Sequence, residues 1–200
     1  MRKHPKTTFL MILAMAVFSS ALLSALAPQQ KAAAATTATA PTKDARVARG
    51  AHLVKTMGCN DCHTPWKMGA RGPEPDMTRA LTGHPEDMKM PPAPVLPPGP
   101  WVWVAAATNT AFAGPWGTSF TANLTPDPET GLGKWTEEMF IATMRTGRHE
   151  GKGRPLLPPM PYPILGALED EDIKSVFAYL QSLPPVHNRV PAPIDPPEGQ

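Results

Sequence analysis

Cysteine is almost absent from this chain: its 200 residues include only two, Cys59 and Cys62. A framework of several disulfides is therefore excluded, as is a zinc site built from four cysteines. Charged residues make up only 18% of the chain, aromatic residues only 6%, and no internal repeat is present. The formal net charge is only +2, and nucleic acid is not an expected partner of a chain with so little net charge.

The two cysteines stand in one short motif. Cys59 and Cys62 are followed directly by His63, which gives the spacing C-x-x-C-H. This spacing is the attachment signature of c-type haem. Each thiol adds to one vinyl group of the haem, and the histidine becomes an axial ligand of the iron. Because the motif occurs once, the sequence predicts one covalently attached haem c, with His63 as a metal ligand.

Three other interpretations of the motif explain less of it. A redox dithiol of the thioredoxin type requires a βαβ context, and none precedes Cys59. A zinc site requires a further pair of ligands, and the chain has no second C-x-x-C and no H-x-x-x-H. A disulfide between Cys59 and Cys62 leaves His63 without a role.

A second axial ligand is expected from the proline-rich segment 154–162, which reads R-P-L-L-P-P-M-P-Y. Prolines stiffen the loop and present Met160 in a fixed position, which suits a thioether ligand of iron. We therefore predict Met160 as the sixth ligand. The competing side chains are Met139, Met144, His84 and His149, of which the two methionines are expected to fill a helix face.

The first 35 residues have the pattern of an export signal. Three basic residues, Arg2, Lys3 and Lys6, precede an apolar stretch at 9–27, and alanines follow. Cleavage near Ala34 or Ala35 is expected, and an uncleaved membrane anchor is the alternative. Either one predicts a periplasmic location. Removal of residues 1–35 leaves 15 basic residues against 17 acidic ones, a net charge of −2.

The rest of the chain divides by composition. Residues 36–43 are expected to be a linker, residues 44–183 one domain with one core, and residues 184–200 a proline-rich tail that is extended on the surface or without fixed structure. Helices are predicted at 45–57, 137–146 and 170–182, with a shorter helical turn at 76–81. Asp44 and Thr136 are the predicted N-caps of the first two helices.

The middle of the domain lacks helix signals. Residues 90–100 are proline-rich and are expected to resemble polyproline, whereas 101–104 and 111–121 read as short strands or extended segments. A connection of this length is expected to wrap around the haem. The alternative is that its tryptophans only fill the core.

The order of these features resembles the class I cytochrome c family. More narrowly, it is similar to single-haem bacterial periplasmic c-type cytochromes related to the haem subunits of alcohol, aldehyde and nicotinate dehydrogenases. The resemblance lies in F-T-A-N-L-T-P-D at 120–127, T-G-L-G at 130–133 with Trp135, T-G-R-H at 146–149, and the Met160 loop. Such dehydrogenase subunits usually carry three haem motifs, and this chain has one.

The resemblance implies a fold: all-α, a cytochrome c fold with a long Pro/Trp-rich loop insertion that has room for a short β-hairpin. The first and last helices should cross at Gly50, against the Tyr179 side. Pro73 either offers its carbonyl to Nδ1 of His63 or is simply a turn proline. The propionates of the haem need donors, and the candidates are the basic and indole side chains near the Met160 arm, namely Arg145, Arg148, His149, Arg154, Trp101, Trp103, Trp116 and Trp135. Of these, Arg148 and Trp116 are preferred; the alternative is that the arginines are solvated and the tryptophans only pack.

The implied function is one-electron transfer without enzyme activity, between a dehydrogenase or quinol-linked donor and a terminal acceptor. The expected partners are redox proteins, namely a dehydrogenase, an oxidase or another cytochrome. Two alternatives stay open. One is a haem protein with a labile sixth ligand that acts as a peroxidase-like enzyme or gas sensor, and the other is an envelope protein without haem.

Overall fold

The computed structural model describes residues 41–196. The predicted signal or anchor and most of the predicted linker therefore lie outside the described residues. The described part has five α-helices: α1 (Lys43–Thr56), α2 (Cys59–His63), α3 (Glu137–Thr146), α4 (Tyr162–Leu165) and α5 (Asp170–Gln181). None of the helices in residues 41–196 is both long and apolar enough to cross a membrane.

Helix α1 begins slightly before its predicted start. Its N-cap is Thr42, whose hydroxyl accepts the N–H of Ala45 at 3.2 Å. The prediction of Asp44 as the cap is wrong, because Asp44 already lies in the first turn. An acidic side chain there is favoured by the helix dipole. The sequence contains two good capping residues close together, and only the backbone conformation distinguishes them.

The two later helices confirm their predictions. Thr136 caps α3 by accepting the N–H of Met139 at 3.2 Å, and Gly147 ends the helix with a φ of 64°. Helix α5 spans 170–181, one residue less than predicted. Its apolar residues recur at helical spacing and are buried, namely Ile173, Val176, Phe177 and Leu180.

Helices α1 and α5 cross at Gly50, as expected. A Cβ at this position would lie 2.7 Å from Cβ of Tyr179 and would collide with the carbonyl oxygen of Ser175. Glycine therefore lets the two backbones touch. Next to the crossing, the guanidinium of Arg49 binds both carboxylate oxygens of Asp172, each at 2.8 Å.

The all-α prediction is wrong, because the described residues also form two small antiparallel sheets. One pairs β1 (Trp66–Gly69) with β2 (Gly72–Pro75), and the other has the order β3 (Val104–Ala105), β4 (Ala111–Gly114), β5 (Gly117–Phe120). The hairpin allowed in the insertion is thus part of a three-stranded sheet. The strands are two to four residues long, too short for the alternation of apolar and polar residues to stand out.

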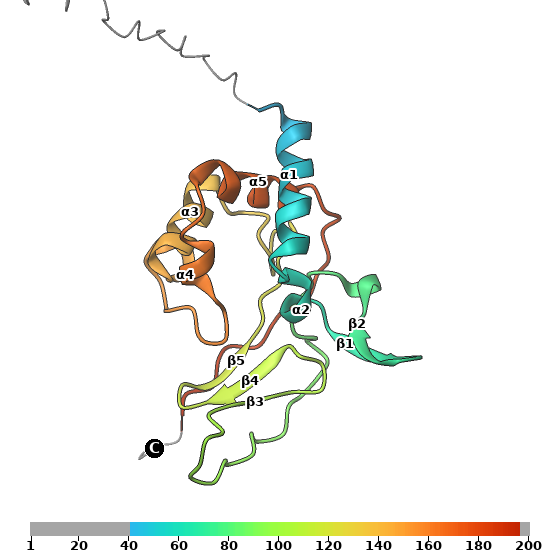
Figure 1. Ribbon diagram of the computed structural model, residues 1–200, viewed down its shortest axis with the longest axis vertical. Coiled ribbons are helices and arrows are strands. Elements are labelled where there is room, and N and C mark those ends of the chain that lie inside the picture. The colour runs from blue at the N-terminus through green and yellow to red at the C-terminus, as the bar shows by residue number, and fades with distance from the viewer. Residues whose placement is uncertain (1–40, 197–200) are drawn as a thin grey trace, which may run out of the picture. The chain divides into compact units, whose positions relative to one another are not determined.

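Helices α1, α3, α4 and α5 lie together at one end of the described domain and β3–β5 at the other (Figure 1). Helix α2 lies between them at the end of α1, with the hairpin β1–β2 beside it. The main apolar core lies among α1, α3 and α5, where the rings of Phe140 and Phe177 are 5.2 Å apart. The predicted turn at 76–81 is a short 3-10 helix, Met77–Arg79, capped by the side chain of Asp76.

After α5, residues 184–196 run back along the domain in an extended path without regular helix. Near the end of this segment, Ile194 exchanges two backbone hydrogen bonds with Thr118 of β5, at 2.8 and 2.9 Å. The segment thus ties the end of α5 to the three-stranded sheet.

Candidate haem-binding site

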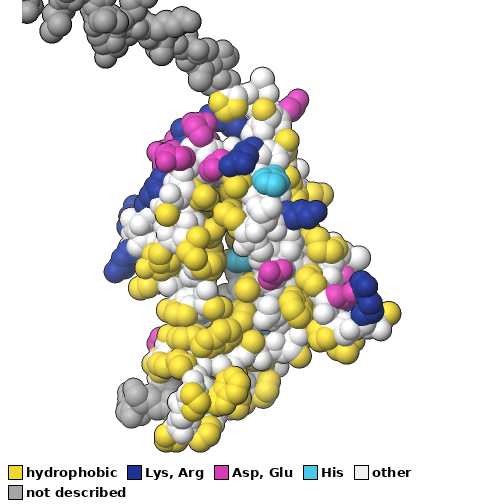
Figure 2. Space-filling model, viewed as in Figure 1, with side chains coloured by type: hydrophobic (Ala, Val, Ile, Leu, Met, Phe, Trp, Pro, Cys, Tyr) yellow, Lys and Arg dark blue, Asp and Glu magenta, His cyan; other side chains and the backbone are white. Residues whose placement is uncertain are grey.

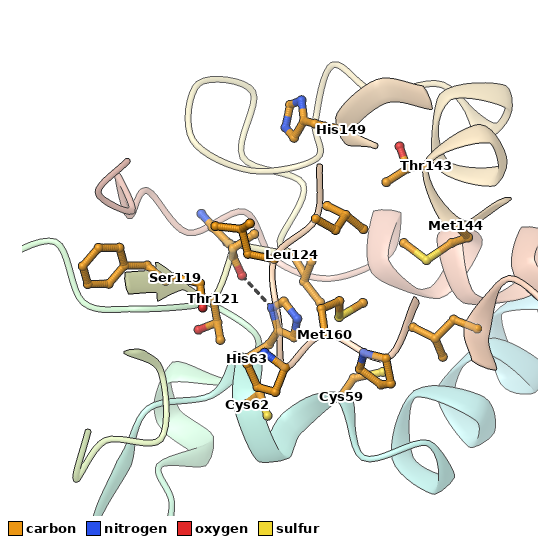
Figure 3. Close-up of a pocket in the computed structure, with 18 of the residues that line it drawn as sticks. Cys59, Cys62, His63, Ser119, Thr121, Leu124, Thr143, Met144, His149 and Met160 are labelled. Atoms are coloured by element: carbon orange, nitrogen blue, oxygen red, sulfur yellow. Dashed lines mark hydrogen bonds between the residues drawn. The ribbon is translucent and has the colours of Figure 1, made fainter. Parts of the chain in front are cut away.

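A cavity of about 530 Å³ lies between the helices and the sheet. Cys59, Cys62, His63 and Met160 all line it, so the structure brings the four principal predicted site residues together (Figure 3). The other lining residues are mostly apolar, as in cavities that bind small molecules and cofactors. These residues suit a large flat apolar group with two points of attachment and one or two metal ligands.

The two thiols lie on the single short helix α2. Gly58 precedes this helix with a φ of 70°, which turns the chain out of α1. Residues three apart on a helix share a face, so both sulfurs are directed to the same side. Burial raises the pKa of Cys59 to about 11 and also raises the pKa of Cys62. Both thiols of the haem-free chain are therefore protonated at neutral pH.

His63 is buried, with 8% of its surface exposed. Its Nδ1 lies 2.8 Å from the carbonyl oxygen of Ala122 (dashed line in Figure 3). A carbonyl only accepts hydrogen bonds, so Nδ1 carries the proton and Nε2 keeps a free lone pair. Burial also lowers the pKa of His63, which keeps the ring neutral. Both effects prepare Nε2 to ligate a metal.

The carbonyl that accepts from His63 is therefore not that of Pro73. Pro73 lies in β2, where it pairs with Met68. The role falls to Ala122 because residues 81–84 and 121–124 lie side by side and are joined by backbone hydrogen bonds, including His84 N–H to Thr121 O at 2.9 Å. Sequence reasoning missed Ala122, although it lies in the run at 120–127 that carries the resemblance.

Met160 lies in a loop that is held at several points. The hydroxyl of Ser119 in β5 donates to the carbonyl of Pro158 at 2.6 Å, and the N–H of Tyr162 donates to the carbonyl of Met160 at 2.9 Å. Two other methionines, Met57 and Met144, also line the cavity. Met144 is on α3 and belongs to the apolar core, whereas Met160 is on a separate arm.

The two histidines that compete with Met160 differ in position. His84 is fully buried but does not line the cavity, and both of its ring nitrogens are engaged, Nδ1 with Thr110 Oγ1 at 2.9 Å and Nε2 with the Met88 carbonyl at 3.3 Å. His149 does line the cavity, with its ring 4.9 Å from that of Trp135 in an edge-to-face arrangement.

The predicted propionate donors are only partly brought to the cavity. Trp103, Trp135 and Arg154 line it, whereas Trp116 and Arg148 do not. Arg148 is exposed and donates to the carbonyl of Gly153 at 3.0 Å. Trp116 packs over Gly114. Within the described residues its buried indole N–H has no hydrogen-bond partner.

Among the described residues, no three His, Cys, Asp or Glu side chains come together in a way that could hold a metal ion. His63 supplies an imidazole directly after the two thiols, and Met160 is the loop thioether that shares their cavity. This combination of two thiols, one imidazole and one thioether fits a covalently attached haem.

The sequence of most of the described domain matches a known protein family. The profile of the family described as Cytochrome c matches residues 47–184. Among curated proteins, a subunit of the nicotinate dehydrogenase of Pseudomonas putida is 35% identical over 126 residues, covering 50% of this chain and 10% of its own. The cytochrome c subunit of a quinone alcohol dehydrogenase from Gluconobacter oxydans is 29% identical over 136 residues, covering 68% of this chain and 21% of its own.

A third relative is the fructose dehydrogenase cytochrome subunit of Gluconobacter japonicus. It is 38% identical over 76 residues, which cover 38% of this chain and 15% of that protein. The chain thus spans only a small part of the length of these relatives.

Proposed function

Because the chain belongs to the cytochrome c family, we propose that it is a one-electron carrier with one haem c ligated by His63 and Met160. The observation that carries this proposal is the shared cavity: two thiols, an imidazole with a free Nε2 and a loop thioether line the same apolar space. Haem c, when bound, supplies an iron centre that alternates between the ferrous and ferric states.

Each of these residues has its own part in the proposal. Cys59 and Cys62 tether the group to α2, and the Ala122 carbonyl orients His63 and raises the basicity of its Nε2. Met160, on a loop that Ser119 anchors, would supply the second axial ligand of the iron. If His63 and Met160 both bind the iron, no position would be left for a substrate, and the haem would carry electrons rather than catalyse a reaction on a small molecule.

The decisive experiment is the visible spectrum of the purified protein and of two methionine variants. We expect a low-spin spectrum with a weak sulfur-to-iron band, and a haem that stays on the chain through acid–acetone extraction. Met160→Ala should abolish the sulfur band and let cyanide or carbon monoxide bind. Met144→Ala is the matched control, because this methionine also lines the cavity but belongs to the core.

The outcomes separate the candidate functions. High-spin features in the wild type indicate a labile sixth ligand and favour the peroxidase-like or gas-sensing alternative. A wild-type protein without haem favours an envelope protein of another kind. If the sulfur band survives in Met160→Ala and disappears in Met144→Ala, Met144 is the ligand and our assignment of Met160 is wrong. A low-spin spectrum without any sulfur band in the wild type points to His149.

We further propose an exported, periplasmic location and a dehydrogenase as redox partner. The names of the relatives support a dehydrogenase as the partner, since each relative is a subunit of a dehydrogenase.

The region proposed for docking is residues 90–126, which contain no charged side chain. They expose Trp101 and Val102 to water, while the neighbouring Trp103 lines the cavity. Hydrophobic side chains cover the region over β3–β5 in Figure 2, which favours this region for transient docking of the partner.

A further inference from the structure

The segment that follows α5 is pinned to the domain although it lies beyond the family match, which ends at residue 184. We call residues 185–196 the C-terminal strap. Asn188 is its anchor: it is 4% exposed, and its side-chain amide donates to the carbonyls of Thr82 at 2.6 Å and His84 at 2.9 Å. Its side-chain oxygen accepts the N–H of Glu86 at 3.0 Å. The backbone on both sides of Asn188 is therefore fixed.

Two more contacts hold the strap on either side of this anchor. The carbonyl of Val186 accepts from the side-chain amide of Asn123 at 2.8 Å, and the N–H of Arg189 donates to a carboxylate oxygen of Glu86 at 2.6 Å. Ile194 pairs with Thr118 farther along. The strap thus has a defined path from α5 to β5, and Arg189 has a fixed backbone position.

A second pocket of about 360 Å³ lies under the strap. It shares walls with the main cavity, since both are lined by Phe120, Ala122, Asn123, Thr130, His149, Arg154 and Pro193. Ala122 is the residue whose carbonyl accepts from His63. The second pocket is therefore a side chamber on the His63 side of the cavity.

The charges around this side chamber favour an anion. Arg154 and Arg189 line it together with one acid, Glu129, so two cationic side chains face a single carboxylate. The contact between Arg189 and Glu129 is long, 4.0 Å, and both side chains are about two-thirds exposed, so this pair holds Arg189 only weakly. The guanidinium of Arg154 donates to the carbonyl of Pro155 at 3.3 Å. Both arginines keep N–H donors with which to bind a carboxylate.

We propose that the side chamber binds a carboxylate group of the haem, and that Arg189 of the strap and Arg154 of the Met160 arm are its cationic partners. This rests on the function proposed above. The strap lies outside residues 47–184, which match the family profile. Arg189 is then a haem-site residue from outside the family domain. Asn188 does not line the pocket; it is a positioning residue that holds the strap next to Arg189.

The test compares reduction potentials of single variants of the holoprotein. A cation near the iron favours the ferrous state, which carries one positive charge less, and a carboxylate that loses its cation favours the ferric state. Arg189→Gln should therefore lower the potential, whereas Arg189→Lys, which keeps the charge, should stay close to the wild type. Arg148→Gln is the matched control, because Arg148 is an exposed arginine outside both pockets.

Arg189 is largely exposed, so all three variants should fold with the melting temperature of the wild type. An Arg189→Gln protein with an unchanged low-spin spectrum and the potential of the wild type would overturn this proposal while leaving the electron-carrier function intact. An equal fall in Arg148→Gln would also overturn it, because the effect would then follow net charge and not the pocket. Failure of the electron-carrier proposal is recognised separately, by the absence of a low-spin haem spectrum in the wild type.

Discussion

At the scale of single residues, the orientation and tautomer of His63 are set by the carbonyl of Ala122, which lies 59 residues farther along the chain. Gly83 packs directly against that carbonyl and against the carbonyl oxygen of Thr121. It has a φ of +78°, and a Cβ there would lie 2.6 Å from the carbonyl carbon of Ala122 and 2.7 Å from its oxygen. The N–H of Gly83 also donates to the carbonyl of His63 at 2.8 Å. A glycine is needed here because of its positive φ and because a Cβ would collide with the carbonyl group of Ala122.

We predict that Gly83→Ala raises the reduction potential. The added methyl group displaces the Ala122 carbonyl, which weakens its bond to Nδ1 and makes His63 a less basic ligand, so the ferric state is less favoured. Gly72→Ala is the control, because Gly72 also has a positive φ, +124°, but a Cβ there would have no heavy atom within 4 Å. Redox titration of both variants decides the matter. An equal shift in both would mean that backbone strain alone is responsible.

How far the residues of the site could be predicted depends on the distance over which each one acts. Cys59, Cys62 and His63 were recognisable because haem attachment needs them at fixed spacing along one helix. Ala122 has a side chain without chemistry, and its carbonyl matters only because two distant segments lie side by side. Arg148 was preferred over Arg154 as a propionate donor, but Arg154 is the one that lines the cavity. The two arginines are close in sequence, and only the folded loop decides which one lines the cavity.

At the scale of elements, the three long helices were predicted nearly to their observed ends, whereas the sheets were predicted only in part. Residues 101–104 and 111–121 were expected as short strands or extended segments and contain β3, β4 and β5, but the hairpin β1–β2 was not predicted. Helices α3 and α5 carry apolar side chains at helical spacing next to clear start or stop residues, and each signal lies within or beside the element itself. The strands are stabilised by pairing with partners that the sequence does not mark. Residues 90–126 offer little contrast between polar and apolar faces because they contain no charged residue at all.

The contact between α1 and α5 gives a prediction about acid stability. The guanidinium of Arg49 holds the pKa of Asp172 below its ordinary value of 3.8. A lowered carboxyl pKa stabilises the fold above the ordinary value, and this contribution is lost as the pH falls through the lowered value. Asp172→Asn should therefore be slightly less stable than the wild type near pH 7. Because both side chains are partly exposed, the loss should be small relative to the total stability.

The pH dependence distinguishes this ion pair from a general effect of charge. The difference in unfolding free energy between wild type and Asp172→Asn should be constant above about pH 5 and should shrink below the ordinary carboxyl pKa. Denaturant titrations followed by circular dichroism, from neutral pH down to the ordinary carboxyl pKa and below it, measure this difference. Glu74→Gln is the control, since this exposed carboxylate forms no ion pair within residues 41–196. A difference that persists unchanged at the acid end would contradict the assignment to Asp172.

At the scale of the whole molecule, the helical end and the sheet end contact the same cavity, and the C-terminal strap joins them. Helix α5 supplies Ile173, Val176 and Leu180 to the cavity wall, and the sheet supplies Phe112 and Ser119. Several residues of the packed core therefore also form the wall of the cavity. The strap could not be predicted from its prolines alone, because its anchor is one buried asparagine bound to carbonyls more than 100 residues away.

This arrangement predicts that the chain folds stably only with its haem. An apolar space of about 530 Å³ is far larger than the voids of a packed protein interior, and without a cofactor its walls would lose many packing contacts. The double variant Cys59→Ala/Cys62→Ala should carry no covalent haem, lose its near-ultraviolet circular dichroism and melt without a cooperative transition. The single variant Cys59→Ala, which keeps one thioether, should retain haem and unfold cooperatively. Calorimetry of the two variants makes the comparison, and a sharp transition in the haem-free double variant would show that the side chains alone close the core.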